Sequence, residues 1–315
     1  MTTAFLFPGQ GSQSVGMMKA LAERYPLVRD TFAEATEAAG IDLWRLAQEG
    51  PDRELNLTVN TQPALLAAEV ATWRVWCGLG VERPAIMTGH SLGEYAALVC
   101  AEALDFPTAV KLVQNRGRYM QSAVPEGAGA MAAILGLEDR AVEAACVAAA
   151  GGEVVAAANY NSPGQIVIAG HASAVKRAIA AAQEAGAKRA VPLPVSVPSH
   201  CELMRPAADA LRRDLEGLDL RPARIPVVQN VDAEVRTDAG GIRNALVEQL
   251  CRPVQWVQCT RRLRQLGVDR AIECGPGKVL AGLVKRIEPG IEVLAGADPA
   301  VIEARLENRA RELHA

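Results

Sequence analysis

The sequence predicts an α/β fold in which a smaller unit is inserted into a larger one built around a mostly parallel sheet. Two observations predict this arrangement. Short apolar runs alternate with longer helical patterns along the chain, and the order of elements changes after Pro125-Glu126-Gly127. Composition agrees, because 50% of the 315 residues are hydrophobic, only 4% are aromatic and alanine is abundant. Such a composition favours helices packed on a sheet.

The first third of the chain predicts two strands of the large sheet and several helices. The apolar run 4–7 ends at Pro8-Gly9-Gln10-Gly11, which is typical of a buried strand that enters a tight turn. The run 84–88 leads into a second turn and then into the alanine-rich stretch 95–99. The remaining helices are predicted at 17–24, 27–39, 63–77 and 107–121.

The middle of the chain predicts a small domain with the order β-α-β-β-α-β. This order is the ferredoxin-like signature, and about 70 residues suffice for it. Prolines in its last strand suggest an edge position. We therefore expect an inserted domain at 126–198 and a larger domain formed by 1–125 and 199–315. The predicted strands are 131–135, 154–158, 165–169 and 189–195, with helices at 137–150 and 172–185.

The last third returns to the large sheet. Gly275-Pro276-Gly277 turns into a helix, but valine follows Lys278 where a phosphate loop needs Ser or Thr. Strands are predicted at 226–229, 270–273 and 293–294, and helices at 205–215, 242–250, 254–266 and 278–286.

Charge and cysteine usage exclude several classes of protein. The formal net charge of −3 argues against a general nucleic-acid binder. The N-terminus lacks the pattern of a signal peptide, and no uncharged apolar run reaches membrane-spanning length. The seven cysteines form no C-x-x-C pair, so we expect reduced thiols and neither zinc sites nor disulfides. We expect a cytoplasmic protein that binds no metal, membrane or nucleic acid.

Gly89-His90-Ser91-Leu92-Gly93 is the candidate catalytic motif. It is a G-x-S-x-G placed between an apolar run and a helix, where a serine hydroxyl is exposed above a helix N-terminus. The alternative is a Gly-Ser turn without chemistry. The earlier Gly9-Gln10-Gly11 is a poor nucleotide motif, because Ser14 replaces its third glycine. That turn is better suited to bring a backbone N–H near Ser91.

A serine nucleophile needs a base, and the chain holds four histidines. His314 is next to the C-terminus, the side chain of His90 should diverge from that of Ser91, and His171 follows a strand of the inserted domain. By elimination His200 is the candidate base, against the alternative of an ordinary loop histidine. Sequence alone identifies no acceptor for its other nitrogen. Cys201 is a poor partner, since adjacent side chains generally point apart.

Two arginines lie on the helix predicted at 107–121. Arg116 and Arg118 are separated by roughly 200° around the helix axis, so at most one can face Ser91. A solvated arginine is the default interpretation. A buried one would need a carboxylate or phosphate partner.

Six motifs occur in one order, and together they resemble a known family. The chain resembles the malonyl-CoA:acyl-carrier-protein transacylases of bacterial fatty-acid synthesis over almost its whole length. The resemblance implies an α/β-hydrolase-like large domain with a ferredoxin-like insertion, in agreement with the order of elements above. The motifs are FPGQG at 7–11, GHSLGEY at 89–95, NRGRYMQ at 115–121, NYNSPGQ at 159–165, VPSH at 197–200 and GPGKVL at 275–280.

The resemblance also implies a role for each matching residue. Ser91 would carry the acyl group, with His200 as its base and the main-chain carbonyl of Gln249 orienting that histidine. The N–H groups of Gln10 and Leu92 would form the oxyanion hole. Arg116, not Arg118, would bind the malonyl carboxylate. Malonyl-CoA and acyl carrier protein would be the substrates, with no cofactor.

Acyl carrier proteins are acidic, so docking requires a local basic patch on this mildly acidic chain. Lys188-Arg189 and Lys285-Arg286 are the candidates, against the alternative of solvated surface charge. Three other functions remain open: a polyketide-pathway malonyl transacylase, a serine esterase or hydrolase, and a non-enzymatic scaffold on the same fold.

Overall fold

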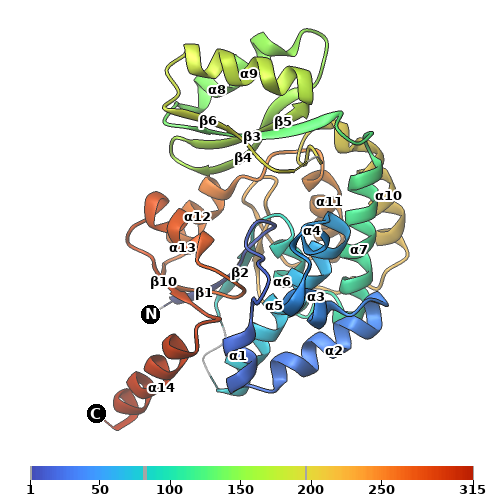
Figure 1. The fold of residues 1–315 in the computed structure, drawn as a ribbon. Helices are drawn as coiled ribbons and strands as arrows, with labels where there is room; N and C mark the ends of the chain where they lie inside the picture. Colours follow the sequence, from blue (N-terminus) through green and yellow to red (C-terminus); the bar gives the residue numbers. More distant parts are fainter. Residues whose placement is uncertain (1, 81–83, 196, 315) are drawn as a thin grey trace.

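The computed structural model describes residues 2–80, 84–195 and 197–314, and its strands form two separate sheets (Figure 1). The larger sheet has the strand order β10-β9-β1-β2-β7-β8. Its first five strands run parallel, and β8 pairs antiparallel with β7. The bounds are β1 (Thr2–Phe7), β2 (Ile86–Gly89), β7 (Val227–Val228), β8 (Val235–Arg236), β9 (Val268–Glu273) and β10 (Glu292–Ala295).

Side chains of β1 alternate between the two faces of the large sheet, so each face has its own core. Phe5 and Phe7 lie in a cluster with α2, α5, α6 and α7, whereas Ala4 and Leu6 lie in a cluster with α12 and α13. The helices are α1 (Lys19–Arg24), α2 (Leu27–Ala39), α3 (Leu43–Glu49), α4 (Asp52–Leu55), α5 (Thr58–Gly78), α6 (Gly93–Cys100), α7 (Phe106–Ser122), η1 (Glu202–Met204), α10 (Arg205–Glu216), α11 (Ala239–Gln249), α12 (Trp256–Gln265), α13 (Val279–Ile287) and α14 (Pro299–His314).

The smaller sheet is antiparallel and has the order β4-β5-β3-β6. Helices α8 and α9 cover the face that points away from the large sheet (Figure 1). The proline-containing last strand lies at an edge, as the sequence predicts. The bounds are β3 (Gly129–Leu135), α8 (Asp139–Ala150), β4 (Val155–Ser162), β5 (Gln165–His171), α9 (Ala172–Glu184) and β6 (Arg189–Pro192).

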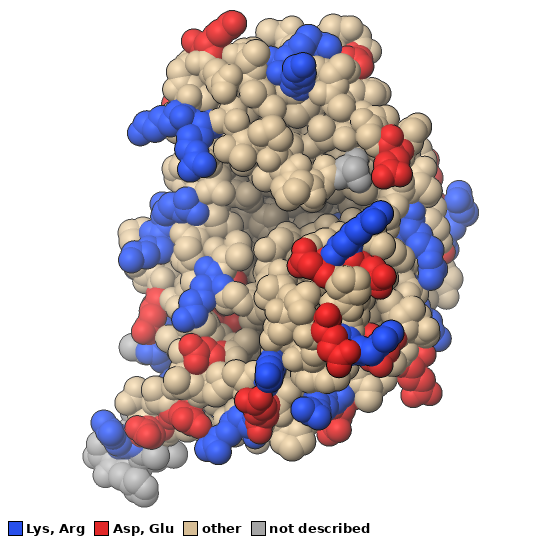
Figure 2. All heavy atoms as spheres, viewed as in Figure 1, with Lys and Arg blue, Asp and Glu red and all other residues tan. Residues whose placement is uncertain are grey.

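Main-chain pairing connects the small sheet to the segment that precedes α12. The N–H of Tyr160 donates to the Val254 carbonyl at 3.0 Å, and the N–H of Val254 donates to the Ala158 carbonyl at 2.9 Å. The face drawn in Figure 2 is hollowed between the part that carries the small sheet and the rest of the molecule. The walls of this hollow show few charged atoms, whereas Lys and Arg side chains follow its left border.

The predicted mixed α/β class with a mostly parallel sheet and a separate small sheet is confirmed. Several element boundaries were wrong. Pro63 lies inside α5 and not at its start, because residues 61–72 are all buried and this packing stabilises the helix despite the missing N–H. Helix α12 begins at Trp256, since Val254 is engaged with β4.

Five elements were not predicted: α3, α4, α14, β8 and the 3-10 turn η1. Helix α3 has an Asp42 cap but only seven residues, and β8 has two, so neither shows a measurable period. Helix α14 is mostly polar, with Ile302 its one fully buried apolar residue among those described. Residues 1, 81–83, 196 and 315 of the predicted domains lie outside the described residues. No helix among the described ranges is both long enough and apolar enough to cross a bilayer.

Candidate active site

The turn between β2 and α6 presents Ser91 at the edge of the large sheet where the parallel strands end. Ser91 has a φ of 52°, a left-handed backbone conformation that costs energy for a residue other than glycine. A Cβ on Gly89 would overlap the backbone of Gly93, and one on Gly93 would overlap the Phe7 carbonyl. Both glycines of the motif are therefore required by close backbone packing.

His200 lies against Ser91 and is aligned by a main-chain carbonyl. Its Nε2 is 2.8 Å from Ser91 Oγ, and its Nδ1 is 2.7 Å from the carbonyl oxygen of Gln249. A carbonyl only accepts, so Nδ1 carries the proton and a neutral ring has its Nε2 lone pair free for the serine hydroxyl. Burial, and secondly the charge of Arg116, lower the pKa of His200 to about 3. The imidazole is therefore neutral at neutral pH.

Arg116 is a buried cation, 1% exposed, with neutral partners. Its guanidinium donates to Gln62 Oε1 at 2.8 Å, to Gln249 Oε1 at 3.0 Å and to Ser91 Oγ at 3.3 Å. It lies over the ring of Tyr95, with its central carbon 5.4 Å from the centroid. Among the described residues no carboxylate forms an ion pair with it. The arrangement places a positive charge without an ion-pair partner among the described residues beside the serine, which favours an anionic ligand.

The second arginine of α7 points elsewhere. Arg118 is exposed and donates to the side chain of Asn115 on its own helix at 2.8 Å. The helical spacing thus separates the two arginines as the sequence predicts, and only Arg116 contacts Ser91.

The loop after β1 contacts the nucleophile turn. The N–H of His90 donates to the Phe7 carbonyl at 2.8 Å, and a Cβ on Gly9 would lie 2.6 Å from the His90 carbonyl oxygen. Within the described residues, neither the N–H of Gln10 nor that of Leu92 donates a hydrogen bond. Both donors are therefore free for a ligand.

The side chains of His90 and His171 are engaged away from Ser91. The Nε2 of His90 is 2.8 Å from Asn161 Oδ1, and burial lowers the pKa of this ring. The Nδ1 of His171 accepts the N–H of Val154 at 3.0 Å, at the start of α9. His314 ends α14, and its side chain lies outside the described part of the chain.

Sequence reasoning missed Asn230, Glu94 and Gln62, and it used only the main chain of Gln249. Asn230 follows β7, so its position after a parallel strand was a usable signal. Glu94 lies in the GHSLGEY motif and is fully buried. An acidic residue in the first turn of a helix normally indicates a surface position, so the sequence did not mark it. Nothing in the local sequence marks Gln62.

The candidate docking residues lie apart from one another. Lys188 and Arg189 are exposed at the start of β6 in the small sheet. Lys285 and Arg286 are exposed in the last turn of α13. That helix starts where β9 ends and leads back to the start of β10, so its last turn lies toward the sheet edge opposite Ser91.

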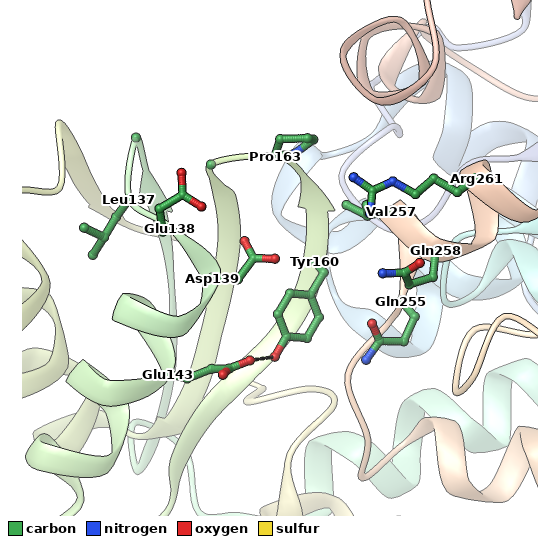
Figure 3. A pocket seen from close by; sticks show the side chains of 12 residues that line it. Leu137, Glu138, Asp139, Glu143, Tyr160, Pro163, Gln255, Val257, Gln258 and Arg261 are labelled. Carbon is green, nitrogen blue, oxygen red and sulfur yellow. Dashed lines mark hydrogen bonds between the residues drawn. The ribbon is translucent and has the colours of Figure 1, made fainter.

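A cavity of about 630 Å³ lies between the small sheet and α12, and none of the predicted catalytic residues lines it (Figure 3). Three carboxyl groups, Glu138, Asp139 and Glu143, face Arg261 across it, and Tyr160 donates to Glu143 at 2.5 Å. Among the described residues, no group of three or more His, Cys, Asp or Glu side chains is placed to hold a metal ion.

The chain is similar to known proteins over nearly its whole length. The model of the acyl transferase domain family matches residues 4–292. The malonyl CoA-acyl carrier protein transacylase of Salmonella typhimurium is 56% identical over 303 residues, covering 96% of this chain and 98% of that protein. The protein of the same name from Bacillus subtilis is 46% identical over 310 residues, covering 98% of both.

Solved structures agree. The acyl carrier protein S-malonyltransferase of Vibrio cholerae superposes with a TM-score of 0.94 at 57% identity, covering 96% of this chain and 99% of that one. A malonyl-transacylase solved in complex with its type II PKS acyl-carrier protein gives 0.96 at 52% identity, covering 98% of this chain and 100% of that one. By sequence and by structure, the chain belongs to the malonyl CoA-acyl carrier protein transacylase family.

Proposed function

We propose that this protein transfers a malonyl group from malonyl-CoA to the phosphopantetheine thiol of acyl carrier protein, with Ser91 as the intermediate carrier. One observation carries the proposal: Ser91 Oγ lies between the neutral imidazole of His200 and the buried guanidinium of Arg116, which has no ion-pair partner among the described residues. The first group activates a hydroxyl, and the second selects an acyl group that bears a carboxylate. The names of the relatives agree with this reaction.

In the first half-reaction the malonyl carboxylate pairs with Arg116, which orients the thioester carbonyl over Ser91. Nε2 of His200 takes the hydroxyl proton as Oγ attacks the carbonyl carbon. The tetrahedral intermediate collapses with cleavage of the C–S bond. His200 then delivers the proton to the departing coenzyme A sulfur, which leaves malonyl-Ser91 and a neutral imidazole.

The second half-reaction reverses these events with a new thiol. His200 takes the proton from the phosphopantetheine thiol, and the sulfur attacks the acyl carbon. The bond between that carbon and Ser91 Oγ breaks, and the proton returns to Oγ. The free N–H groups of Gln10 and Leu92 are suited to stabilise the oxyanion in both halves, where one donor typically contributes ~3–4 kcal/mol.

We also infer the finer description of the fold. The order β3-α8-β4-β5-α9-β6 with the sheet order β4-β5-β3-β6 supports a ferredoxin-like insertion at 126–198. The nucleophile turn between β2 and α6 supports an α/β-hydrolase-like domain at 1–125 and 199–315.

The carrier protein is the macromolecular partner, and we propose that Lys188 and Arg189 contribute to its docking. Both are exposed on the small sheet, and basic side chains border the hollow between the two sheets (Figure 2). Lys285 and Arg286 remain candidates, although they lie toward the opposite edge of the large sheet.

Fatty-acid synthesis in the cytoplasm is the proposed setting. A polyketide pathway is the alternative, because one solved relative is bound to a polyketide carrier.

Acyl trapping tests the proposal. The protein is mixed with malonyl-CoA alone and its intact mass is measured. We expect a stable gain of one malonyl group that maps to Ser91, is absent from Ser91→Ala and is discharged by carrier protein bearing phosphopantetheine. Steady release of free malonate without carrier protein would identify a hydrolase instead. Absence of any adduct would contradict both.

A further inference from the structure

Asn230 bridges the two sides of the nucleophile turn, Gly89 and Ser91, from its buried side. It is fully buried in the loop after β7. Its Oδ1 accepts the N–H of Ser91 at 2.6 Å, and its Nδ2 donates to the Gly89 carbonyl at 2.7 Å. One amide therefore holds the backbone on both sides of His90.

These two hydrogen bonds act on a backbone that needs support. The left-handed φ of Ser91 persists only where the surroundings hold it. The Ser91 N–H and the Gly89 carbonyl both bond to the fully buried Asn230, so removal of its amide would leave polar backbone groups without their partner. A carboxamide is the side chain that both accepts and donates at the required spacing.

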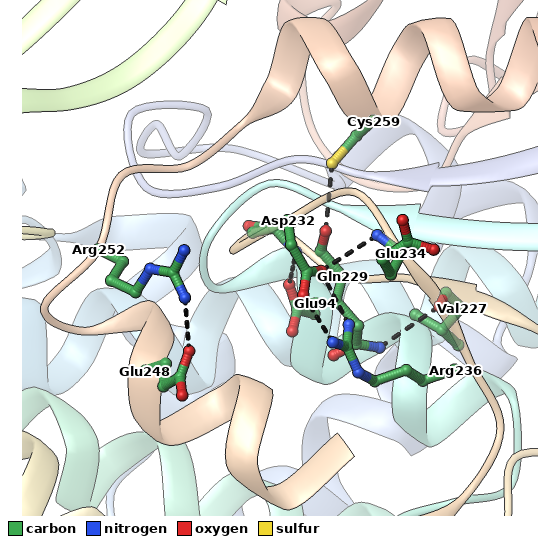
Figure 4. A network of polar contacts seen from close by, with 10 residues as sticks. Glu94, Val227, Gln229, Asp232, Glu234, Arg236, Glu248, Arg252 and Cys259 are labelled. Atoms are coloured by element: carbon green, nitrogen blue, oxygen red, sulfur yellow. Dashed lines mark hydrogen bonds and ion pairs between the residues drawn. The ribbon is translucent and has the colours of Figure 1, made fainter. Parts of the chain in front are cut away.

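Glu94 and Gln255 fix Asn230 through its own main chain. The N–H of Asn230 donates to Glu94 Oε2 at 2.8 Å, and its carbonyl accepts the N–H of Gln255 at 2.9 Å. Glu94 is fully buried in α6, and its Oε1 has no hydrogen-bond partner among the described residues. Figure 4 shows Glu94 beside the hairpin of β7 and β8, next to the ion pair of Arg236 and Asp232.

The charge of Glu94 is consistent with an anchoring role. Burial raises its pKa to about 7, and the Asn230 N–H, Gln249, Arg116 and Arg236 act in the opposite direction. The hydrogen bond from the Asn230 N–H joins this carboxyl group to the loop, and the nearby positive charges of Arg116 and Arg236 favour its ionised form. The carboxyl group fixes the loop that carries the amide.

We propose that Asn230 is a positioning residue for acyl transfer, whose amide holds the Ser91 turn so that Oγ faces His200, with Glu94 anchoring it. Asn230 acts through Ser91 and does not touch the acyl group. The inference rests on the proposed function, so its test includes a reaction of Ser91 that needs no malonyl group.

The test uses the full-length variants Asn230→Ala and Asn230→Asp. Two quantities are measured: kcat and KM for malonyl transfer, and the rate at which a neutral fluorophosphonate modifies Ser91, followed by intact mass. We expect Asn230→Ala to lower both kcat and the modification rate by about 100-fold, because misplacement by about 1 Å costs that much. The KM for malonyl-CoA should stay within about twofold, since Arg116 is untouched.

Asn230→Asp gives a signature that a merely structural role would not give. Its carboxylate still accepts the Ser91 N–H but cannot donate to the Gly89 carbonyl until it is protonated. Relative to wild type at each pH, its modification rate should therefore rise as pH falls from about 8 to about 5. His200 stays neutral in this range. Glu94 contacts the main chain of residue 230, so its negative charge raises the pKa of the introduced carboxyl group and the two groups titrate as a coupled pair within this pH range.

Gln229→Leu is the matched control, because Gln229 is equally buried in the same loop and, among the described residues, no hydrogen bond joins it to residues 89–91. It should alter thermal stability and leave both rates near wild type. A folded Asn230→Ala with wild-type modification rate would overturn the inference. If that variant fails to fold, a flat pH ratio for Asn230→Asp would overturn it. A third outcome would reject only the proposed function. The wild-type protein would transfer no malonyl group, while the fluorophosphonate would still modify Ser91 more slowly in Asn230→Ala than in wild type.

Discussion

The regions below and above Ser91 are built in different ways. Below it, at the edge of the large sheet, buried side chains make the contacts: Asn230 holds the turn, and the Gln249 amide bridges the Ser91 carbonyl and Arg116. Above it, the small sheet is joined by main-chain pairing at Val254 and by the bond from His90 to Asn161. Buried side chains therefore position the groups below Ser91, whereas main-chain pairing and a single side-chain hydrogen bond join the small sheet above it.

This difference predicts that single substitutions below Ser91 have large effects on rate. His200→Ala should lower kcat by ~10²–10⁴-fold, because it removes the acid–base group in both half-reactions. Steady-state transfer of labelled malonyl to carrier protein measures it. His171→Ala, a histidine of the small sheet, is the control and should retain activity. Retention of kcat within tenfold of wild type by His200→Ala would reject the assigned base.

Arg116→Ala tests the buried residue that is proposed to select an acyl group bearing a carboxylate. Loss of a buried charge partner typically costs ~3–5 kcal/mol, so malonyl transfer should fall by at least ~10²-fold. Acetyl transfer should fall far less, because an acetyl group leaves the guanidinium unpaired in wild type. The measurement is kcat/KM with both thioesters. The exposed Arg118→Ala on the same helix is the control. Equal losses for both acyl groups would contradict the role.

Glu94→Gln tests the buried side chains below Ser91 through the pH dependence of the free energy of unfolding. Burial raises the pKa of Glu94 from 4.5 to about 7. Between these values the unfolded chain has lost the proton that the folded chain keeps, so stability falls as pH rises, by roughly 3 kcal/mol in all. Glu94→Gln should remove that loss, measured by denaturant unfolding at several pH values.

His200 contributes with the opposite sign, since its lowered pKa gives stability that grows as pH rises from about 3 to 6.5. Both proteins share this contribution, so it cancels in their difference. The exposed Glu23→Gln on α1 is the matched control and should leave the pH dependence unchanged. An identical pH profile for Glu94→Gln and wild type would show that Glu94 is not the group responsible.

Charge reversal on the surface should have the smallest effect, and it compares the two regions directly. Replacing Lys188 and Arg189 by glutamate should raise the KM for carrier protein by roughly tenfold and leave that for malonyl-CoA unchanged. Reversal of Lys285 and Arg286 should matter less, because α13 carries them away from the site. The KM for carrier protein is measured by varying the carrier protein concentration at low salt. A larger effect at Lys285 and Arg286 would move the docking surface to α13.

The sequence identified Ser91 and His200, which the structure brings to 2.8 Å of each other, better than it identified the residues around them. Ser91 followed from a motif and His200 from elimination among four histidines, because each signal is local. The carbonyl of Gln249 came only from the resemblance. The amide of Gln62 could not be found, since its role depends on how α5 meets the turn in three dimensions. That of Asn230 was missed although its place after β7 was a usable signal. Short elements such as α3 and β8 were missed because they carry too few residues for a period.

The two residues proposed to react share an unusual backbone. Ser91 has a φ of 52° and His200 a φ of 61°, both in the region that favours glycine, at a typical cost of ~1–3 kcal/mol each. Activity and heat resistance are therefore in conflict at these positions. Selection for thermostability alone should enrich glycine at 91 or 200 and yield proteins that outlast the parent but no longer turn over. Directed evolution of this chain needs a screen that demands product at every round.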